Sequence, residues 1–270
     1  MAFFRHLLKY PLANRPGQYL LRKQVKLCHW LMGVGAGAEV DDSGEVAVMK
    51  RFIRQQDREL VVFDVGANCG QFLNLAVQRL GDRLRAIHSF EPAAATFAAL
   101  SKAAPKHAGV VLNPLALGAA PGQAELYYDA EKSGLASLTK RDLAFRQIAF
   151  ERHETITVST LDAYCAAHGI ERIDWLKLDV EGHEFDVLRG GSAMFARRAV
   201  TLVTFEFGGC NIDTRTFLRD FYQFFQAQEM DLYRITPGGY FNRVQRYRET
   251  EEQFATANFV ALRRPPAVQA

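Results

Sequence analysis

The segment from residue 60 to residue 80 constrains the fold more than any other part of the chain. Residues 60–63 are all apolar, which is typical of a strand covered on both faces. A glycine-containing turn follows at 64–70, and an amphipathic stretch then predicts a helix to Leu80. A strand, a tight turn and a helix in this order offer free N–H groups and a partial positive charge to a ligand.

The same alternation of apolar runs and helical stretches continues to residue 262. It predicts one α/β domain with a mostly parallel sheet. Further strands are expected at 86–90, 110–117, 155–159, 175–180 and 200–207, with 123–128 as an added hairpin strand and 232–235 and 258–262 as an antiparallel pair. Pro114 predicts that the third strand lies at the sheet edge. A helix at 213–229 should bury a stripe of Phe217, Leu218, Phe221, Phe224 and Phe225 in the core.

The N-terminal region differs from the rest of the chain in charge. Residues 1–38 contain six basic side chains and no acid, so the net charge of +3 leaves −3 on the remainder. We therefore divide the chain into a basic helical extension, 1–55, and a domain, 56–270. The extension is interpreted as a helical cap on the enzyme or on a second subunit. A basic amphipathic arm at an anionic membrane surface is the alternative.

The mildly acidic domain disfavours a nucleic-acid groove. No run of 18 apolar residues predicts a membrane span, and the stretch before the apolar run at 27–34 is too long for an ordinary secretory leader. The four cysteines are scattered, without zinc spacing, so a reduced, cytoplasmic protein is expected.

Acidic side chains end the first two strands. Asp64 precedes the turn containing Gly66 and Gly70, where an acid suits a ligand with an ammonium and a sulfonium rather than a pyrophosphate. Glu91 closes the next strand, 21 residues beyond Gly70, an offset at which an acid accepts hydrogen bonds from ribose.

A third group lies in the segment 177–184. Strand alternation puts Lys177 and Asp179 on one face, and a lysine in a covered strand needs an acidic partner. Glu206, on the neighbouring strand, is the nearest candidate by register; a structural ion pair between them is the alternative to a functional role. Asp179 and Glu181 are assigned to the site.

These segments together resemble the FkbM family of methyltransferases over residues 60–262. The resemblance rests on six segments: Val62-Phe63-Asp64-Val65-Gly66-Ala67-Asn68-Cys69-Gly70, Phe90-Glu91-Pro92, Ser137-Leu138, Thr160-Leu161-Asp162, Leu176-Lys177-Leu178-Asp179-Val180-Glu181-Gly182-His183-Glu184 and Phe205-Glu206. It implies a Rossmann-like class I methyltransferase fold, S-adenosylmethionine as methyl donor, and O-methylation of a hydroxyl on a sugar, polyketide or glycolipid. It gives no guidance on residues 1–55.

The site residues follow from both arguments. Cofactor binding is predicted for Asp64, Gly66, Asn68, Gly70, Gln71, Glu91, Ser137 and Asp179. Catalytic roles are predicted for Lys177, Asp179, Glu181, His183 and Glu206, with Asp179 and Glu181 as the leading general bases and His183 behind them. A divalent metal held by Asp179, Glu181 and Glu206 is an alternative that we do not favour.

The acceptor is not identified by the sequence. Contacts to it are expected from 1–55, 129–154 and 208–216, where Arg141, Arg146, Arg152 and His153 could grip an acidic acceptor, although a solvated helix face is the preferred interpretation. Rival functions are a nicotinamide-dependent oxidoreductase, whose glycine spacing is missing, and a non-catalytic binding module. Protein or nucleic-acid methylation is disfavoured, and a homo-oligomer is an open alternative.

Overall fold

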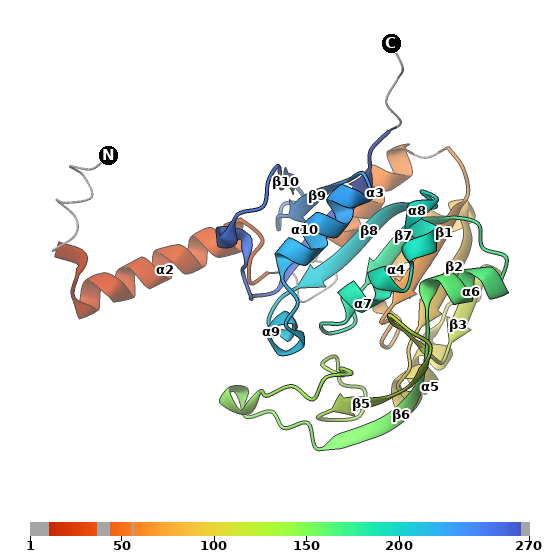
Figure 1. Cartoon of the computed structure of the whole chain (residues 1–270), viewed down its shortest axis with the longest axis horizontal. Coiled ribbons are helices and arrows are strands. Elements are labelled where there is room, and N and C mark those ends of the chain that lie inside the picture. The colour runs from red at the N-terminus through yellow and green to blue at the C-terminus, as the bar shows by residue number, and fades with distance from the viewer. Residues whose placement is uncertain (1–10, 37–43, 56, 266–270) are drawn as a thin grey trace, which may run out of the picture.

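The fold is described from a computed structural model, which covers residues 11–36, 44–55 and 57–265 (Figure 1). An eight-stranded sheet in the order β10-β9-β11-β8-β7-β1-β2-β3 forms its centre. Its parallel part consists of β3 (Val110–Asn113), β2 (Leu84–Phe90), β1 (Leu60–Val65), β7 (Ile173–Leu178) and β8 (Val200–Phe207).

The C-terminal strands complete the sheet in the opposite sense. β11 (Ala257–Arg263) is antiparallel to both β8 and β9 (Met230–Ile235), and β10 (Phe241–Arg243) is antiparallel to β9. The predicted α/β architecture, mostly parallel with an antiparallel C-terminal pair, is confirmed.

Helices cover both faces of the sheet because side chains alternate along each strand. Phe63 and Leu176 contribute to a core on one face, whereas Val62 and Trp175 contribute to a core on the other. The first core is closed by α6 (Leu161–Ala167), α7 (Glu184–Arg189), α8 (Ser192–Ala196) and α10 (Leu218–Ala227). The second is closed by α3 (Glu45–Gln55), α4 (Gln71–Leu80) and α5 (Ala94–Ala103).

The strand predicted at 110–117 is divided in two. β3 lies at the sheet edge as expected, but it ends at Asn113, and β4 (Ala116–Leu117) pairs instead with β6 (Arg152–Ser159). Pro114 lacks the N–H that a continued ladder would need, so the chain leaves the main sheet there. β6 also pairs with β5 (Gly122–Tyr128), so the predicted hairpin strand belongs to a separate three-stranded sheet.

The helix predicted at 213–229 is also divided. α9 (Cys210–Thr214) ends where Arg215 adopts φ 55°, and α10 begins at Leu218. Leu218, Phe221 and Phe225 are fully buried as expected, whereas Phe217 precedes the helix and is 41% exposed. The expectation that Phe217 belongs to the core stripe was therefore wrong, because the helix starts one residue after it. Short 3-10 turns lie at η1 (Gly81–Arg83), η2 (Ala144–Arg146) and η3 (Glu249–Glu251).

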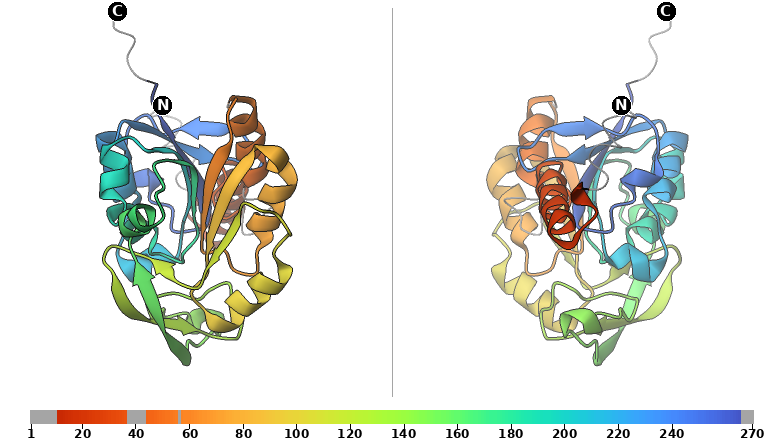
Figure 2. Two further views of the ribbon diagram at one scale, coloured as in Figure 1. Left: turned by 90° about the vertical axis from the view of Figure 1, so that its right-hand side faces the viewer. Right: turned by 90° about the vertical axis from the view of Figure 1, so that its left-hand side faces the viewer.

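The two N-terminal helices behave differently. α2 (Arg15–Leu31) projects away from the body (Figures 1 and 2), so it does not cap this chain's own domain, whereas the alternative of a cap on a second subunit stays a prediction. α3, in contrast to α2, packs on the body of the domain, and its Val48 and Met49 are buried in the core that α4 also covers. The predicted boundary at residue 56 divides the sequence between α3 and the first strand. In the structure, however, α3 packs in the same core as the sheet. None of the described helices is long and apolar enough to span a bilayer.

Candidate active site

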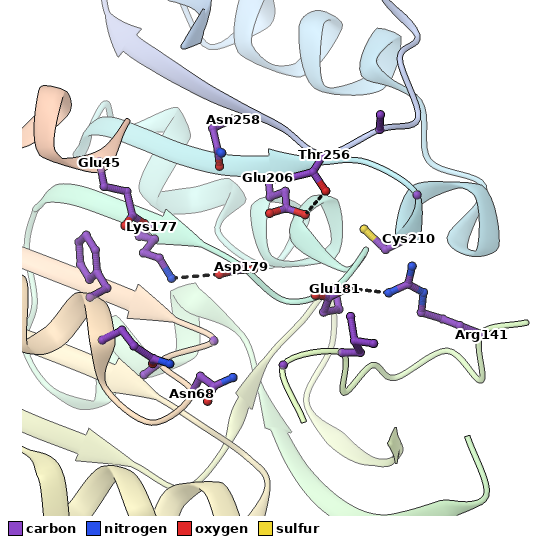
Figure 3. Close-up of a pocket in the computed structure, with 18 of the residues that line it drawn as sticks. Glu45, Asn68, Arg141, Lys177, Asp179, Glu181, Glu206, Cys210, Thr256 and Asn258 are labelled. Carbon is purple, nitrogen blue, oxygen red and sulfur yellow. Dashed lines mark hydrogen bonds and ion pairs between the residues drawn. The ribbon is translucent and has the colours of Figure 1, made fainter. Parts of the chain in front are cut away.

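Two connected pockets lie at the carboxyl ends of the parallel strands, where open α/β sheets bind ligands. The first, here called the wide pocket, has a volume of about 760 Å³ (Figure 3). The second, the narrow pocket, has a volume of about 90 Å³. Both are lined by Gly66, Asn68, Gly134, Asp179 and Glu181, so they form one continuous depression.

The turn after β1 can only be made by glycine at Gly66. Its φ is 83°, and a Cβ there would lie 1.8 Å from the carbonyl oxygen of Asp179. The N–H groups of Gly66 and Ala67 donate to the carbonyl of Phe90 at 3.0 and 2.9 Å. Gly70, at φ 90°, precedes α4, whose first residue, Gln71, lines the wide pocket. The turn therefore brings the ends of β1, β2 and β7 together.

Glu91 lies in the narrow pocket, as the ribose prediction requires. Its carboxylate accepts hydrogen bonds from the N–H groups of Asn68 at 2.9 Å and Ala93 at 3.0 Å. Burial raises the pKa of Glu91 to about 7. Around it the narrow pocket is mainly apolar, lined by Phe90, Pro92, Leu117, Leu126 and Leu138 among others. Glu91 in this apolar slot, with Asp179 and Glu181 where the slot meets the wide pocket, suits a nucleoside, whose ribose donates hydrogen bonds and whose base prefers apolar surroundings.

Lys177 does not pair with Glu206, and this prediction was wrong. Register places Lys177 opposite Asp64 on β1 and Thr204 on β8, so Glu206 lies further along its strand. The Lys177 Nζ is 3.2 Å from Asp64 Oδ1 and 3.5 Å from Asp179 Oδ2. Burial would lower the pKa of the Lys177 ammonium, but the carboxylates of Asp64 and Asp179 outweigh burial and raise that pKa above its ordinary value. Lys177 is therefore a fixed cation.

Asp64 occupies a different position from the one that its predicted ligand role needs. Its side chain is fully buried beneath the turn and contributes to the lining of neither pocket. The ion pair with Lys177 links β1 to β7 directly under the site. We therefore correct the role of Asp64 from a direct ligand contact to an anchor for Lys177.

Asp179 and Glu181 both line the pockets, but they differ in exposure and in their charged partners. The Asp179 side chain is 45% exposed and its main polar neighbour is Lys177. Glu181 accepts a hydrogen bond from Arg141 Nη1 at 2.6 Å, and its φ of 50° is unusual for a non-glycine residue. Burial raises the pKa of Glu181 to about 8, and the nearby Asp179 charge adds to that rise. Figure 3 shows both acids facing the wide pocket.

Arg141 is buried in the loop before η2, which contradicts the interpretation of a solvated helix face. Besides Glu181 it contacts Asp213 of α9, with its Nε 3.2 Å from Oδ2. It thus joins the 129–154 and 208–216 regions across the site. Arg146 also lines the wide pocket, whereas Arg152 and His153 lie on β6 outside both pockets.

Glu206 lies on the opposite wall of the wide pocket. Thr256 Oγ1 donates to Glu206 Oε1 at 3.4 Å. Burial raises the pKa of Glu206 to about 9, with Asp179, Glu181 and Glu184 each adding to the rise. Carboxylates that oppose one another's ionisation in this way favour a cationic ligand between them. Within the described residues, no group of three or more His, Cys, Asp or Glu side chains is arranged to hold a metal ion.

His183 and Ser137 contribute through hydrogen bonds inside the protein. The two ring nitrogens of His183 contact Thr139 Oγ1 at 3.0 Å and Asp186 Oδ2 at 2.9 Å. With both nitrogens engaged, His183 lacks a free site for the general-base role that we had considered. Ser137 Oγ donates to the carbonyl of Glu181 at 2.8 Å, so it holds the backbone of this turn beside the narrow pocket.

Several residues that shape or line the site had no role assigned to them from the sequence. Glu184 was quoted only as part of the motif, but its Oε1 accepts from the N–H groups of Val180 and Gly182 and fixes the turn. Glu45 and Asn258 also line the wide pocket. They come from α3 and β11, far from the motif segments, and no local spacing connects them to it.

The fold is that of a Rossmann-like methyltransferase, and a family model matches the chain. Residues 64–233 match the family model described as the methyltransferase FkbM domain. The chain therefore belongs to the FkbM methyltransferase family, and its sheet is the class I methyltransferase fold that the resemblance implied.

One curated relative is the hexuronic acid methyltransferase AglP of Haloferax volcanii. It is 25% identical over 150 residues, which cover 56% of this chain and 57% of the relative. Among solved structures, an FkbM methyltransferase from Methylobacillus flagellatus aligns at 13% identity over 76% of this chain and 44% of that chain, with a TM-score of 0.45. A SAM-dependent methyltransferase from Agrobacterium tumefaciens aligns at 10% identity over 84% and 63%, with a TM-score of 0.44.

Proposed function

We propose that this protein uses S-adenosylmethionine to methylate a hydroxyl group of a saccharide that carries an acidic group. The observation that carries the proposal is the continuous depression itself. It joins an apolar slot containing Glu91 to a wide pocket lined by Asp179, Glu181 and Glu206. Family membership supports methyl transfer as the reaction class.

The residues present fit the proposed donor. Glu91 would accept hydrogen bonds from the ribose hydroxyls, and the surrounding apolar side chains would cover the base. Gly66 has no side chain, so at this position the turn presents only its backbone to the two pockets that it lines. The bound donor would supply an electrophilic methyl group on a sulfonium, and the acidic wall of the wide pocket matches that positive charge.

Asp179 is the side chain best suited to take the proton from the acceptor hydroxyl. Glu181 is held by Arg141, and Glu206, with its pKa near 9, carries a proton at neutral pH. Lys177 is a cation between two carboxylates and cannot accept a proton. Asp179 lines both pockets and its side chain is 45% exposed, so its carboxylate is within reach of an acceptor hydroxyl.

In this scheme the acceptor oxygen forms a bond to the methyl carbon while its proton passes to Asp179. The bond between that carbon and the sulfur of the donor breaks, and its electron pair stays on sulfur. The enzyme's contribution is alignment, worth roughly 7–11 kcal/mol in well-positioned reactions, and general-base assistance, worth about 10²–10⁴-fold.

The acidic character of the acceptor rests on Arg146 and on the named relative. Arg146 lines the wide pocket and makes no ion pair with any described residue, unlike Arg141 and Lys177, which line the same pocket. A sugar carboxylate would pair with it. The hexuronic acid methyltransferase of Haloferax volcanii supports a uronic acid as the first acceptor to try.

The experiment has two parts. Calorimetry with S-adenosylmethionine, S-adenosylhomocysteine and NAD should give binding of the first two only. Turnover of labelled donor should then be measured with oligosaccharides that end in a hexuronic acid or in the matching neutral hexose. Absence of donor binding at millimolar concentration would refute the function, whereas equal turnover of the two sugars would refute only the acidic acceptor.

A further inference from the structure

The helix α2 has features that the proposed reaction does not use. It lies outside the segment 64–233 that matches the family, and it extends away from the body (Figure 1). Leu20, Leu27 and Leu31 are 52%, 58% and 57% exposed. Large apolar side chains gathered on one exposed helix mark an interaction surface.

The helix is divided into a basic face and an apolar face. At 3.6 residues per turn, Leu20, Leu27 and Leu31 fall on one side, at spacings of seven and four residues. Arg15, Arg22 and Lys26 repeat the same spacings five residues earlier, which places them on the opposite side. No acidic residue occurs between Arg15 and Leu31.

Two aromatic residues lie between these faces. Tyr19 and Trp30 are eleven residues apart, which returns them to the same edge of the helix, and both are largely exposed. Lys23 lies along this edge, with its Nζ 5.5 Å from the centroid of the Tyr19 ring. Tyrosine and tryptophan are favoured where an apolar layer meets a polar one, because each has an apolar ring and a polar group.

We propose that α2 binds the surface of an anionic lipid bilayer, with its leucine face toward the acyl chains and its basic face among the headgroups. Charge complementarity favours lipid because the helix carries only positive charge, whereas residues 39–270 carry a net negative charge that an anionic surface would repel. With the leucines in the acyl layer, the basic face on the opposite side of the helix would lie among the anionic headgroups.

The end of α2 is fixed to the body beside the wide pocket. The N–H of Gly35 donates to the carbonyl of Thr256 at 2.7 Å, and Val34 is buried. Gly33 lies so close to β9 that a Cβ would be 2.2 Å from the carbonyl oxygen of Ile235. Ala255 and Thr256 line the wide pocket. A bilayer that holds α2 would therefore hold this wall of the pocket near its surface, and, if the proposed function is correct, near membrane-attached saccharides.

The test is sedimentation of the full-length protein with vesicles. Phosphatidylcholine vesicles containing roughly one quarter phosphatidylglycerol should bind the protein at least tenfold more strongly than pure phosphatidylcholine, since an anionic surface attracts each basic residue of the helix. The double variant Arg22→Glu/Lys26→Glu should lose this preference. The matched control Lys102→Glu/Lys106→Glu, which makes the same charge change on α5 and after it, should retain it.

The apolar face is tested separately. The triple variant Leu20→Ser/Leu27→Ser/Leu31→Ser should lose vesicle binding, while Tyr240→Ser, an exposed aromatic change on the body, should not. Melting temperatures should be unchanged in all variants, because these side chains are outside the core. The proposal is overturned if wild-type protein binds both vesicle types equally. It is also overturned if the wild-type protein does not bind vesicles and light scattering shows that it is an oligomer that the leucine changes dissociate. Neither readout depends on methyl transfer.

Discussion

The narrow pocket and the wide pocket meet at Asp179, yet they are built from different kinds of sequence. The narrow pocket is lined mainly by short segments around residues 65–68, 90–92, 133–138 and 179–183. The wide pocket adds Glu45, Arg141, Arg146, Glu206 and the segment 254–258. The first is therefore formed by strand-end motifs of the parallel sheet together with the loop 133–138 and the three-stranded sheet. The second adds further loops and elements that only the fold brings together.

We therefore expect the narrow pocket to bind the donor and the wide pocket to bind the acceptor of the proposed reaction. Strand ends are rigid and can hold a common donor in the same way in many enzymes, whereas loops can change to suit an acceptor. Variants on the two sides should accordingly give different kinetic effects.

The largest effect is expected at Asp179, where the pockets meet. Asp179→Asn removes the proton acceptor but keeps the size of the side chain. We expect kcat to fall about 10²–10⁴-fold, while the donor dissociation constant from calorimetry stays within a small factor. Unchanged kcat in this variant would exclude Asp179 as the general base.

The next comparison is between Glu91, which we expect to contact the donor, and Asp64, which is buried and anchors Lys177. Glu91→Gln should weaken donor binding roughly 10- to 100-fold, because hydrogen bonds to a charged group contribute about 1.5–3 kcal/mol. Its melting temperature should fall only slightly, since glutamine keeps one of the two N–H contacts that Glu91 makes. Asp64→Asn should instead destabilise the fold by about 3 kcal/mol, because it removes one partner of a buried ion pair.

Calorimetry and thermal denaturation of both variants check this pair. If Asp64→Asn lost donor affinity as strongly as Glu91→Gln while melting normally, Asp64 would be a ligand contact after all.

The wide pocket should respond through the acceptor. Arg146→Gln should raise KM for a uronic acid acceptor roughly threefold to tenfold, because an exposed arginine forms only a moderate pair with a carboxylate. The donor affinity should not change. Arg152→Gln is the matched control, since Arg152 lies on β6 outside the pockets; an equal effect of both variants would indicate a nonspecific influence of charge.

The smallest expected effect is a pH dependence of donor selectivity. Burial raises the pKa of Glu181 to about 8 and that of Glu206 to about 9, so both acids ionise as the pH rises from 7 to 9. The preference for the sulfonium donor over its uncharged thioether product should then increase roughly threefold. Both ligands carry the same amino group, so the ratio of their dissociation constants isolates the sulfonium.

The same two acids set the sign of a stability change. The folded protein holds protons that the unfolded chain releases near pH 4.5, so the contribution of Glu181 and Glu206 to stability falls as pH rises toward 9. A melting temperature of the ligand-free Glu206→Gln variant that declines with pH as steeply as the wild type would count against the raised pKa of Glu206.

The sequence determined the succession of strands and helices along the chain, the glycine turn and the acids at the strand ends. These follow from local rules: apolar runs predict covered strands, and only glycine tolerates the backbone at Gly66. Family membership was likewise carried by contiguous motifs.

Tertiary structure alone decided which charges meet. Lys177 pairs with Asp64 rather than Glu206 because strand register, set by packing of the whole sheet, places it opposite β1's acid. Arg141 reaches Glu181, and Asn258 reaches the pocket, from segments distant in the chain. Burial and pairing depend on neighbours in space, so periodicity and spacing along the chain cannot assign them.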